Sequence, residues 1–325
     1  MRKTLRGLVT TTLLAMTVSA ACAAAPDRTE CIAPAKPGGG FDLTCKLIQV
    51  SLQETGQIQS PMRVTYMPGG VGAVAYNAII AQRPAEAGTL VAFSGGSLLN
   101  LAQGKFGRYS ESDVRWLAAV ATDYGIVAVR HDAPWQNLNE LMAAMKRDPT
   151  KVVVGAGASI GSQDWMKTAV LARKSDIDPR KMRYVAFEGG GEAVTALLGN
   201  HIQVVSGDMS EMVPHLQAGK LRVLAVMADK RLPDELANVP TAKEQGYDMT
   251  WPIIRGYYLG PKVSDADYQW WQDAFKKLVA TPEFQKQRAQ RGLFEFNLFG
   301  SELDAYVKKQ VADYREQAKS FGLAK

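Results

Sequence analysis

The chain has 325 residues, of which 46% are hydrophobic, so its length and composition suit a globular protein with one large core or two smaller ones. Its formal charge of +6 arises from Lys and Arg residues scattered among Asp and Glu. The sequence has no basic runs interleaved with aromatic residues, which argues against a nucleic-acid partner.

The first 25 residues are predicted to be an export signal. Arg2, Lys3 and Arg6 precede an apolar stretch, residues 8–18, that is too short to span a bilayer. Small residues follow, and we expect cleavage near Ala24 or Pro26, which lowers the formal charge from +6 to +3 because three cations are lost. We therefore expect a periplasmic chain.

Cys22 leaves an alternative open, because a cysteine after small residues can be a lipid-attachment site. However, Ser19 stands where such sites normally have Leu. No later segment approaches about 20 continuous apolar residues, so we expect the exported chain to be water-soluble.

The first unit of the exported chain, residues 32–50, reads "IAPAKPGGGFDLTCKLIQV": an apolar strand, three glycines at 38–40 and a helix. Adjacent glycines are favoured where the backbone needs positive φ or approaches something closely. Cys31 and Cys45 flank this loop, and in an exported protein such a pair is naturally a disulfide. The alternative is two buried thiols.

This unit of strand, Gly-rich or small polar loop and amphipathic helix recurs along the chain. Apolar runs of four to six residues that alternate with helical patterns predict an α/β protein with mostly parallel sheets flanked by helices. Asp42, Ser97, Ser162 and Asp208 are predicted to cap helix starts. The later units are "MRVTYMPGGVGAVAYNAIIAQ", "TLVAFSGGSLLNLAQ", "KVVVGAGASIGSQDWMKTAVLARK", "MRYVAFEGGGEAVTALLGN" and "IQVVSGDMSEMVPHLQAGK".

Two extended segments separate the units into two groups. Residues 126–130 are predicted to form a strand that leaves the first sheet, and residues 249–261 form a second extended stretch. We therefore expect a discontinuous first domain, 26–124 and 255–325, and a second domain, 125–254, joined by two strands. From Ser264 onward the pattern is helical, with a core face at Trp270, Trp271, Phe275 and Leu278.

Ligands of parallel sheets bind outside the carboxyl ends of the strands, where helix N-termini supply unpaired amides. Gly38 to Gly40 are therefore expected to form one wall of a carboxylate or phosphate cradle in a cleft between the domains. Arginine is absent from the loops, so we expect main-chain amides and hydroxyls to hold the ligand. The hydroxyls are those of Ser94, Ser97, Ser159 and Ser162.

Glu188 and Asp208 argue against an anionic ligand, because carboxylates repel an anion unless they are protonated, bridged by water or turned toward a ligand hydroxyl. Each could instead cap a helix.

An enzymatic alternative rests on "GASIG", residues 157–161, which matches the G-x-S-x-G turn of a serine hydrolase with Ser159 as nucleophile. The base is missing from its usual place, because no His follows residue 215. The dinucleotide and P-loop patterns are absent and the three His residues lack metal-ligand spacing. We therefore expect a protein that is not an enzyme and needs no metal or cofactor.

Five segments together resemble the substrate-binding proteins of tripartite tricarboxylate transporters, also called the Bug family. They are "ECIAPAKPGGGFDLTCKL", "VTYMPGGVGAVAYN", "YVAFEGGGEAVTALLGNHIQVVSGDMSEM", "VPTAKEQGYD" and the leader. The cysteine-flanked loop is most similar to the citrate or tricarboxylate branch. The resemblance implies a two-domain Venus flytrap that closes around a carboxylate, with citrate as the first candidate.

The resemblance also implies partners: the large and small membrane subunits of the transporter and, in some relatives, a two-component sensor kinase to which the liganded receptor is presented. We expect a monomer. The ligand-binding residues implied are Pro37, Gly38, Gly39, Gly40, Phe41, Asp42, Gly69, Gly70, Ser94, Gly95, Ser97, Gly157, Ser159, Gly161, Ser162, Glu188, Gly189, Gly190 and Asp208.

Overall fold

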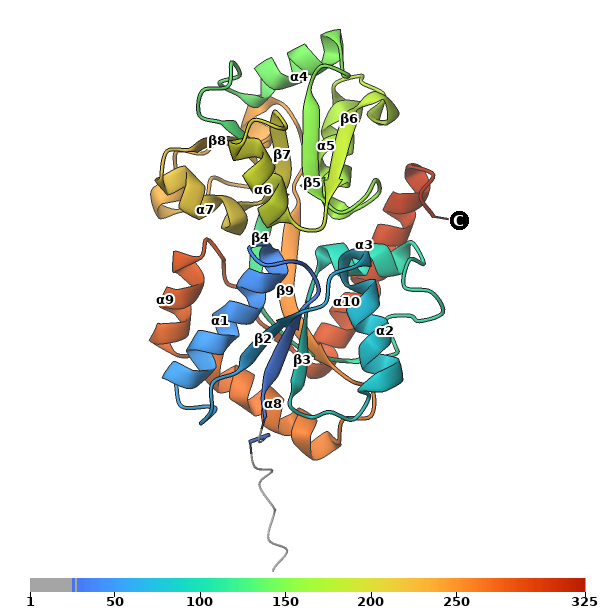
Figure 1. Cartoon of the computed structure of the whole chain (residues 1–325), viewed down its shortest axis with the longest axis vertical. Helices are drawn as coiled ribbons and strands as arrows, with labels where there is room; N and C mark the ends of the chain where they lie inside the picture. The colour runs from blue at the N-terminus through green and yellow to red at the C-terminus, as the bar shows by residue number, and fades with distance from the viewer. Residues whose placement is uncertain (1–24, 27, 325) are drawn as a thin grey trace, which may run out of the picture.

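The computed structural model describes residues 25–26 and 28–324. The chain forms two halves stacked along the long axis of the molecule, each a sheet flanked by helices, as Figure 1 shows. The predicted α/β architecture is confirmed. The predicted export signal, residues 1–25, lies outside the described residues except for position 25, and so does Cys22.

The sheet of the first half contains three parallel strands and antiparallel strands beside them. The order is β2-β1-β3-β9-β4, and β10 also pairs with β4. The bounds are β1 (Glu30–Ala33), β2 (Arg63–Tyr66), β3 (Thr89–Ser94), β4 (Arg115–Arg130), β9 (Pro252–Leu259) and β10 (Leu298–Phe299).

The sheet of the second half repeats this plan. Three parallel strands, in the order β7-β5-β6, adjoin the second part of β4, which pairs antiparallel with β7 and β8. The bounds are β5 (Val153–Gly157), β6 (Arg183–Phe187), β7 (Val204–Asp208) and β8 (Leu221–Val226).

Helices follow most of the parallel strands and cover the sheets. The α-helices are α1 (Gly40–Glu54), α2 (Ala73–Gln82), α3 (Gly95–Ala102), α4 (Leu138–Arg147), α5 (Gln163–Lys174), α6 (Gly190–Leu198), α7 (Met209–Gln217), α8 (Asp265–Val279), α9 (Pro282–Gln290) and α10 (Gly300–Ser320). Short 3₁₀ turns are η1 (Gly70–Gly72), η2 (Pro179–Lys181), η3 (Asp234–Leu236) and η4 (Lys243–Gln245).

Both faces of the first sheet are covered by helices. Successive side chains of a strand point to opposite faces, so neighbouring residues of one strand pack in different clusters. On β3, Val91 and Phe93 pack in the cluster that contains residues of α2, α3 and α10. Leu90 and Ala92 pack in the cluster that contains residues of α1, α8 and α9. Of the predicted core face of the C-terminal region, Trp271, Phe275 and Leu278 are buried, and Trp270 is partly buried.

Two strands, β4 and β9, run between the halves (Figure 1). They pair with each other along the junction, where Asp123 is opposite Ile253 and Thr122 is opposite Ile254. The strand expected at 126–130 is thus only the end of β4, which begins at Arg115. The domain boundaries at 124/125 and 254/255 stay a prediction, and we propose them as the places where the chain crosses between the halves.

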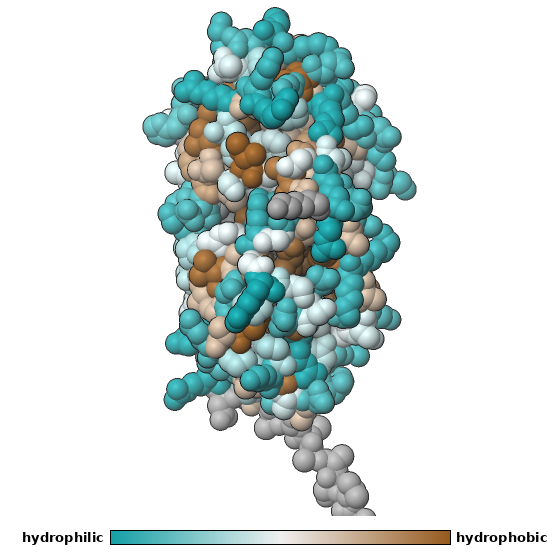
Figure 2. Space-filling view, turned by 90° about the vertical axis from the view of Figure 1, so that its right-hand side faces the viewer, coloured by the Kyte–Doolittle hydropathy of each residue, from teal (hydrophilic) through white to brown (hydrophobic). Residues whose placement is uncertain are grey.

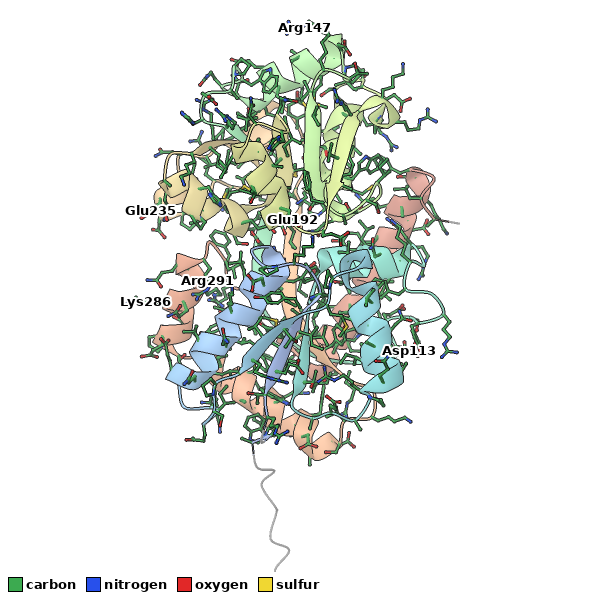
Figure 3. All side chains as sticks on the ribbon, in the orientation of Figure 1. Asp113, Arg147, Glu192, Glu235, Lys286 and Arg291 are labelled. Atoms are coloured by element: carbon green, nitrogen blue, oxygen red, sulfur yellow. A yellow bond between two sulfur atoms is a disulfide. The ribbon has the colours of Figure 1, made fainter. Side chains whose placement is uncertain are left out.

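The outer surface carries most of the charged side chains, and Asp113, Arg147 and Lys286 mark the outside of the molecule in Figure 3. On the face seen in Figure 2, hydrophobic residues form small separate groups among hydrophilic ones. Over residues 25–26 and 28–324, the structure contains no helix with the length and apolar composition to cross a bilayer.

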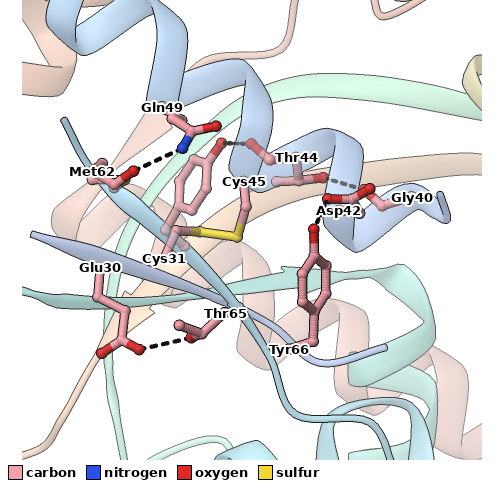
Figure 4. Close-up of a disulfide and its surroundings, with 11 residues drawn as sticks. Glu30, Cys31, Gly40, Asp42, Thr44, Cys45, Gln49, Met62, Thr65 and Tyr66 are labelled. Atoms are coloured by element: carbon pink, nitrogen blue, oxygen red, sulfur yellow. Dashed lines mark hydrogen bonds between the residues drawn. A yellow bond between two sulfur atoms is a disulfide. The ribbon is translucent and has the colours of Figure 1, made fainter. Parts of the chain in front are cut away.

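The predicted disulfide is present. Cys31 on β1 and Cys45 on α1 are bonded, with a Cα–Cα distance of 5.6 Å, and both side chains are fully buried (Figure 4). Gln49 of α1 donates a 2.8 Å hydrogen bond to the carbonyl of Met62, just before β2. The disulfide therefore holds β1 and α1 together on either side of the glycine loop.

Loss of this bond is expected to destabilise the protein. The cysteines are 14 residues apart in sequence, and closing a loop of that size stabilises by about 3 kcal/mol in the chain-entropy model. Urea unfolding of the oxidised protein, the reduced protein and the Cys31→Ala/Cys45→Ala variant should show this loss in the last two. Equal stability of the oxidised and reduced forms would contradict the expectation.

Candidate functional site

A cavity of about 310 Å³ lies between the two halves. Its walls come from the carboxyl ends of β3, β5, β6 and β7 and from the residues that begin α1, α5 and α6. The N-terminus of a helix carries unpaired amides and a partial positive charge, so a cavity where several of them converge favours an anion.

Most of the residues implied by sequence lie on this cavity. Those that line it are Gly39, Gly40, Phe41, Gly69, Gly70, Ser94, Gly157, Ser159, Ser162, Glu188, Gly189, Gly190 and Asp208. Those outside its lining are Pro37, Gly38, Asp42, Gly95, Ser97 and Gly161. Contact of any of them with a ligand stays a prediction.

Asp42 supports the glycine loop from behind. Its carboxylate accepts hydrogen bonds from the amide of Gly38 at 2.7 Å and from the hydroxyl of Tyr66 at 2.9 Å, and it pairs with Lys46. The prediction that it caps α1 is wrong, because the helix begins earlier and Gly39 is the N-cap residue.

Of the other three predicted caps, Ser162 and Asp208 are at N-cap positions, and Ser97 lies three residues after one. Ser162 accepts the amide of Trp165 at 3.3 Å and caps α5, and Asp208 stands at the N-cap position of α7. Ser97 is inside the first turn of α3, whose N-cap residue is Ser94. Ser97 instead accepts the amide of Ser94 at 3.4 Å.

The triple glycine has two distinct structural causes. Gly38 has a φ of +87°, a conformation that strongly favours glycine. Gly40 has ordinary helical geometry, but a Cβ atom there would lie 2.3 Å from Nη1 of Arg255. The loop is therefore glycine-rich partly because an arginine packs directly beneath it.

The loops themselves contain no arginine, but an arginine reaches the site from a strand. Arg255 lines the cavity although it belongs to none of the loops, since it comes from the middle of β9. Its side chain is 98% buried, and its Nη2 lies 2.7 Å from Asp123 of β4 and 2.5 Å from Asp208 of β7. An arginine of the connecting strand therefore joins both halves.

A second buried cation extends this group. Lys167 of α5 is fully buried, and its Nζ lies 2.8 Å from Asp164, 2.7 Å from Asp208 and 2.6 Å from the carbonyl of Gly207. We call the five side chains of Asp123, Asp164, Lys167, Asp208 and Arg255 the ionic cluster. Its members share hydrogen bonds, as a buried charge requires to remain ionised.

The ionic cluster determines the pKa of its acids. Burial alone would raise the pKa of Asp208, but Lys167 and Arg255 outweigh it and lower that pKa. Burial raises the pKa of Asp164 to about 6 against the opposing effect of Lys167. Asp208 is therefore the firmly ionised carboxylate of the cluster.

Glu211 of α7 lines the cavity beside the ionic cluster. Burial, followed by the charges of Asp208 and Asp164, raises the pKa of Glu211 to about 8. One of its oxygens accepts the amide of Gly40 at 2.8 Å, which links α7 of the second half to α1 of the first.

Further contacts bring the two halves together around the cavity. Lys36 pairs with Glu192 at 2.7 Å, and Glu192 lies at the boundary between the halves in Figure 3. Gln103 donates a 2.8 Å hydrogen bond to the carbonyl of Gly161. The guanidinium of Arg173 lies 3.5 Å from the ring centroid of Phe321, which follows α10. The structure therefore represents a closed arrangement.

Sequence reasoning missed several cavity residues with charged or polar side chains: Asn100, Lys105, Gln163, Asp164, Glu211 and Arg255. Two signals were available. Arg255 is the lone charge in the apolar segment "PIIRGYYL", and Asp208 and Glu211 have the spacing of a capping box. Lys105, on the loop after α3, carries no comparable signal.

Comparison with protein families gives one broad match. The family described as "Tripartite tricarboxylate transporter family receptor" matches residues 49–323. Among individual relatives, Protein BugT of Bordetella pertussis is 26% identical over 221 residues, which cover 67% of this chain and 65% of BugT. A "UPF0065 protein in gbd 5′ region" of Cupriavidus necator is 27% identical over 203 residues, 62% of this chain and 60% of that protein. In both alignments the chain covers less than two thirds of the relative.

Solved structures share the fold. MatC from Rhodopseudomonas palustris with bound malate has a TM-score of 0.78 and 20% identity, covering 90% of this chain and 99% of MatC. An R. palustris protein with adipate has a TM-score of 0.82 and 16% identity, covering 91% of this chain and 98% of the other. At these identities the likeness concerns the architecture.

The packing of Arg255 against the loop predicts different effects at neighbouring glycines. Gly40→Ala should destabilise the protein by about 1–3 kcal/mol, because the added methyl group overlaps a buried guanidinium that cannot move away. Gly39→Ala is the matched control, since its Cβ would have no neighbour closer than 3.4 Å. Urea unfolding of both variants checks this, and equal stabilities would contradict it.

The ionic cluster predicts a strong dependence on Lys167. Lys167→Met should lower the free energy of unfolding by about 3–5 kcal/mol, because Asp164 and Asp208 lose a buried partner. Lys36→Met, which breaks an exposed ion pair with Glu192, should leave stability nearly unchanged. Chemical denaturation measures both, and a small effect at Lys167 would show that the cluster is not needed for folding.

Proposed function

Because the chain belongs to the tripartite tricarboxylate transporter receptor family, we propose that it is a periplasmic receptor that binds a di- or tricarboxylate in the cavity between its halves. The receptor has no chemical step of its own. It hands the bound acid to the large and small membrane subunits of a tripartite transporter.

The observation that carries the proposal is the position of the cavity. It is enclosed by loops from both halves, at the start of α1, α5 and α6, so that one ligand touches both halves when they close. A ligand that contacts both halves favours the closed state by its difference in affinity for the two states. Selective capture then follows from closure.

Charge in the cavity supports an anionic ligand at one end. Lys105 lines the cavity and, within the described part of the chain, has no carboxylate within 4 Å. Arg255 is already engaged by Asp123 and Asp208. We infer that a ligand carboxylate pairs with Lys105 and with helix amides, and that Arg255 chiefly shapes the loop.

The size of the site and the ligands of similar proteins support a small acid. The volume of about 310 Å³ is at the lower end of the range for small-molecule pockets. The similar structures carry malate and adipate. Citrate remains our first candidate because the cysteine-flanked loop resembles the citrate branch, and the disulfide of that loop is present.

The proposal includes location and partners. We propose that residues 1–25 direct export to the periplasm, that the receptor acts as a monomer, and that the liganded form can also be presented to the periplasmic domain of a two-component sensor kinase.

Ser159 offers a second function, hydrolysis, with less geometric support. In a nucleophile elbow the serine stands at the turn from strand to helix. Here β5 ends at Gly157 and α5 begins only at Gln163, so Ser159 lies in the middle of a longer loop. If the protein is a hydrolase, Ser159→Ala should abolish hydrolysis. If it is a carboxylate receptor, Ser159→Ala should spare carboxylate binding or only weaken it.

A thermal-shift screen tests the proposed function. Citrate, malate, succinate and adipate are the test ligands, and adipamide is the uncharged control. A ligand at 100 times its dissociation constant should add about 2.7 kcal/mol to the free energy of unfolding. Failure of all four acids to raise the melting temperature would contradict the proposal.

The same screen on two lysine variants tests the place of binding. Lys105→Met should weaken the best acid about tenfold or more, because a charge-assisted hydrogen bond is lost. Lys181→Met, in the exposed turn η2 and outside the cavity lining, should have no effect.

A further inference from the structure

Glu211 is a carboxyl group built into the wall of the proposed ligand cavity. It accepts the amide of Gly40 at 2.8 Å and the amide of Asp208 at 3.3 Å, so it lies at the N-termini of α1 and α7. A side chain at Gly190, which begins α6, would overlap its carboxyl group. Three helix N-termini therefore converge on one glutamate.

Glu211 differs from the other buried acids of the site in its partners. Asp123 and Asp208 pair with Arg255, and Asp164 pairs with Lys167. Among the described residues, no Lys or Arg nitrogen lies within 4 Å of Glu211. Glu211 is thus held by amides alone.

The charged groups around Glu211 come from several elements, and together they disfavour a negative charge on Glu211 itself. Asp208, at the start of its own helix, and Asp164 of α5 repel a negative charge on Glu211. Arg255 of β9 and Lys167 of α5 have the opposite, smaller effect. On β4, Asp123 is bound to Arg255.

The nearby acids of α1 and α6 are occupied elsewhere. Asp42 is held by Lys46, and Glu192 is held by Lys36. The ionic cluster itself contains three acids and two cations, so it has no positive charge to spare for Glu211.

We propose that Glu211 is the proton-donating residue of the site: in the liganded receptor its carboxyl group is neutral and donates a hydrogen bond to a carboxylate of the ligand. The inference rests on the proposed function. Two carboxylates that share a cavity shielded from water cannot both remain ionised. A proton held between them turns the repulsion into a short O–H···O⁻ hydrogen bond.

The free receptor is already poised for this role, because burial, Asp208 and Asp164 raise the pKa of Glu211 to about 8. A ligand carboxylate nearby raises that pKa further. Affinity is therefore full while Glu211 is protonated in the free receptor, and it falls as the pH rises above about 8, because binding then requires uptake of a proton.

Isothermal titration of the whole exported chain tests the inference. The probe is adipate, both of whose carboxyl groups are ionised above about pH 7.5. Adipate should bind about tenfold more weakly at pH 9 than at pH 7.5. At pH 9, heats measured in two buffers of different ionisation enthalpy should reveal the uptake of close to one proton.

Two variants isolate the residue. Glu211→Gln keeps the shape and a donor, so it should bind adipate with an affinity that is flat across this pH range and without proton uptake. Glu283→Gln is the control, since it removes an exposed carboxylate of α9 that lies outside the cavity lining, and it should keep the wild-type pH dependence.

The outcomes separate the two proposals. Adipate binding that is independent of pH, without proton uptake in the wild-type protein, overturns the role of Glu211 and leaves the receptor function intact. If citrate, malate, succinate and adipate all fail to bind at pH 7.5, both the receptor function and the role of Glu211 are overturned. A Glu211→Gln variant that retains the wild-type pH dependence assigns the proton to another group and also overturns the inference.

Discussion

The site depends on a buried ionic cluster at the place where the two halves meet. Arg255 comes from one connecting strand and Asp123 from the other, and both are joined through Asp208 to Lys167 of α5. Buried ion pairs contribute little net stability, but removal of one partner is strongly destabilising. The cluster therefore specifies the geometry of the junction, and three of its members, Asp164, Asp208 and Arg255, line the cavity.

The cavity above the cluster follows from that geometry. Gly40 must lack a side chain because Arg255 lies beneath it, and the disulfide fixes the helix that Gly40 begins. Arg255 and Lys167 both pair with aspartates, so the cations of the ionic cluster carry no excess positive charge. In our proposal, recognition of the ligand falls to helix amides, to Lys105 and to a protonated Glu211.

The sequence predicted the local parts of this arrangement well. Glycine-rich turns between short apolar runs and helices predicted the parallel strands, the loops and about half of the cavity lining, because those signals lie within a few residues. The disulfide was also accessible, since Cys31 and Cys45 flank one loop.

What sequence reasoning missed was set by contacts between distant segments. Arg255 lies more than 200 residues from the loop that it supports, and the pairing of Lys167 with Asp208 requires the packing of α5 against β7.

The most direct test of the account is a crystal structure of the receptor with a bound dicarboxylate. We predict the acid in the cavity between the halves, with one carboxylate oxygen about 2.5–2.7 Å from a carboxyl oxygen of Glu211. A ligand bound elsewhere, or one whose carboxylates avoid Glu211 and the helix amides, would contradict it.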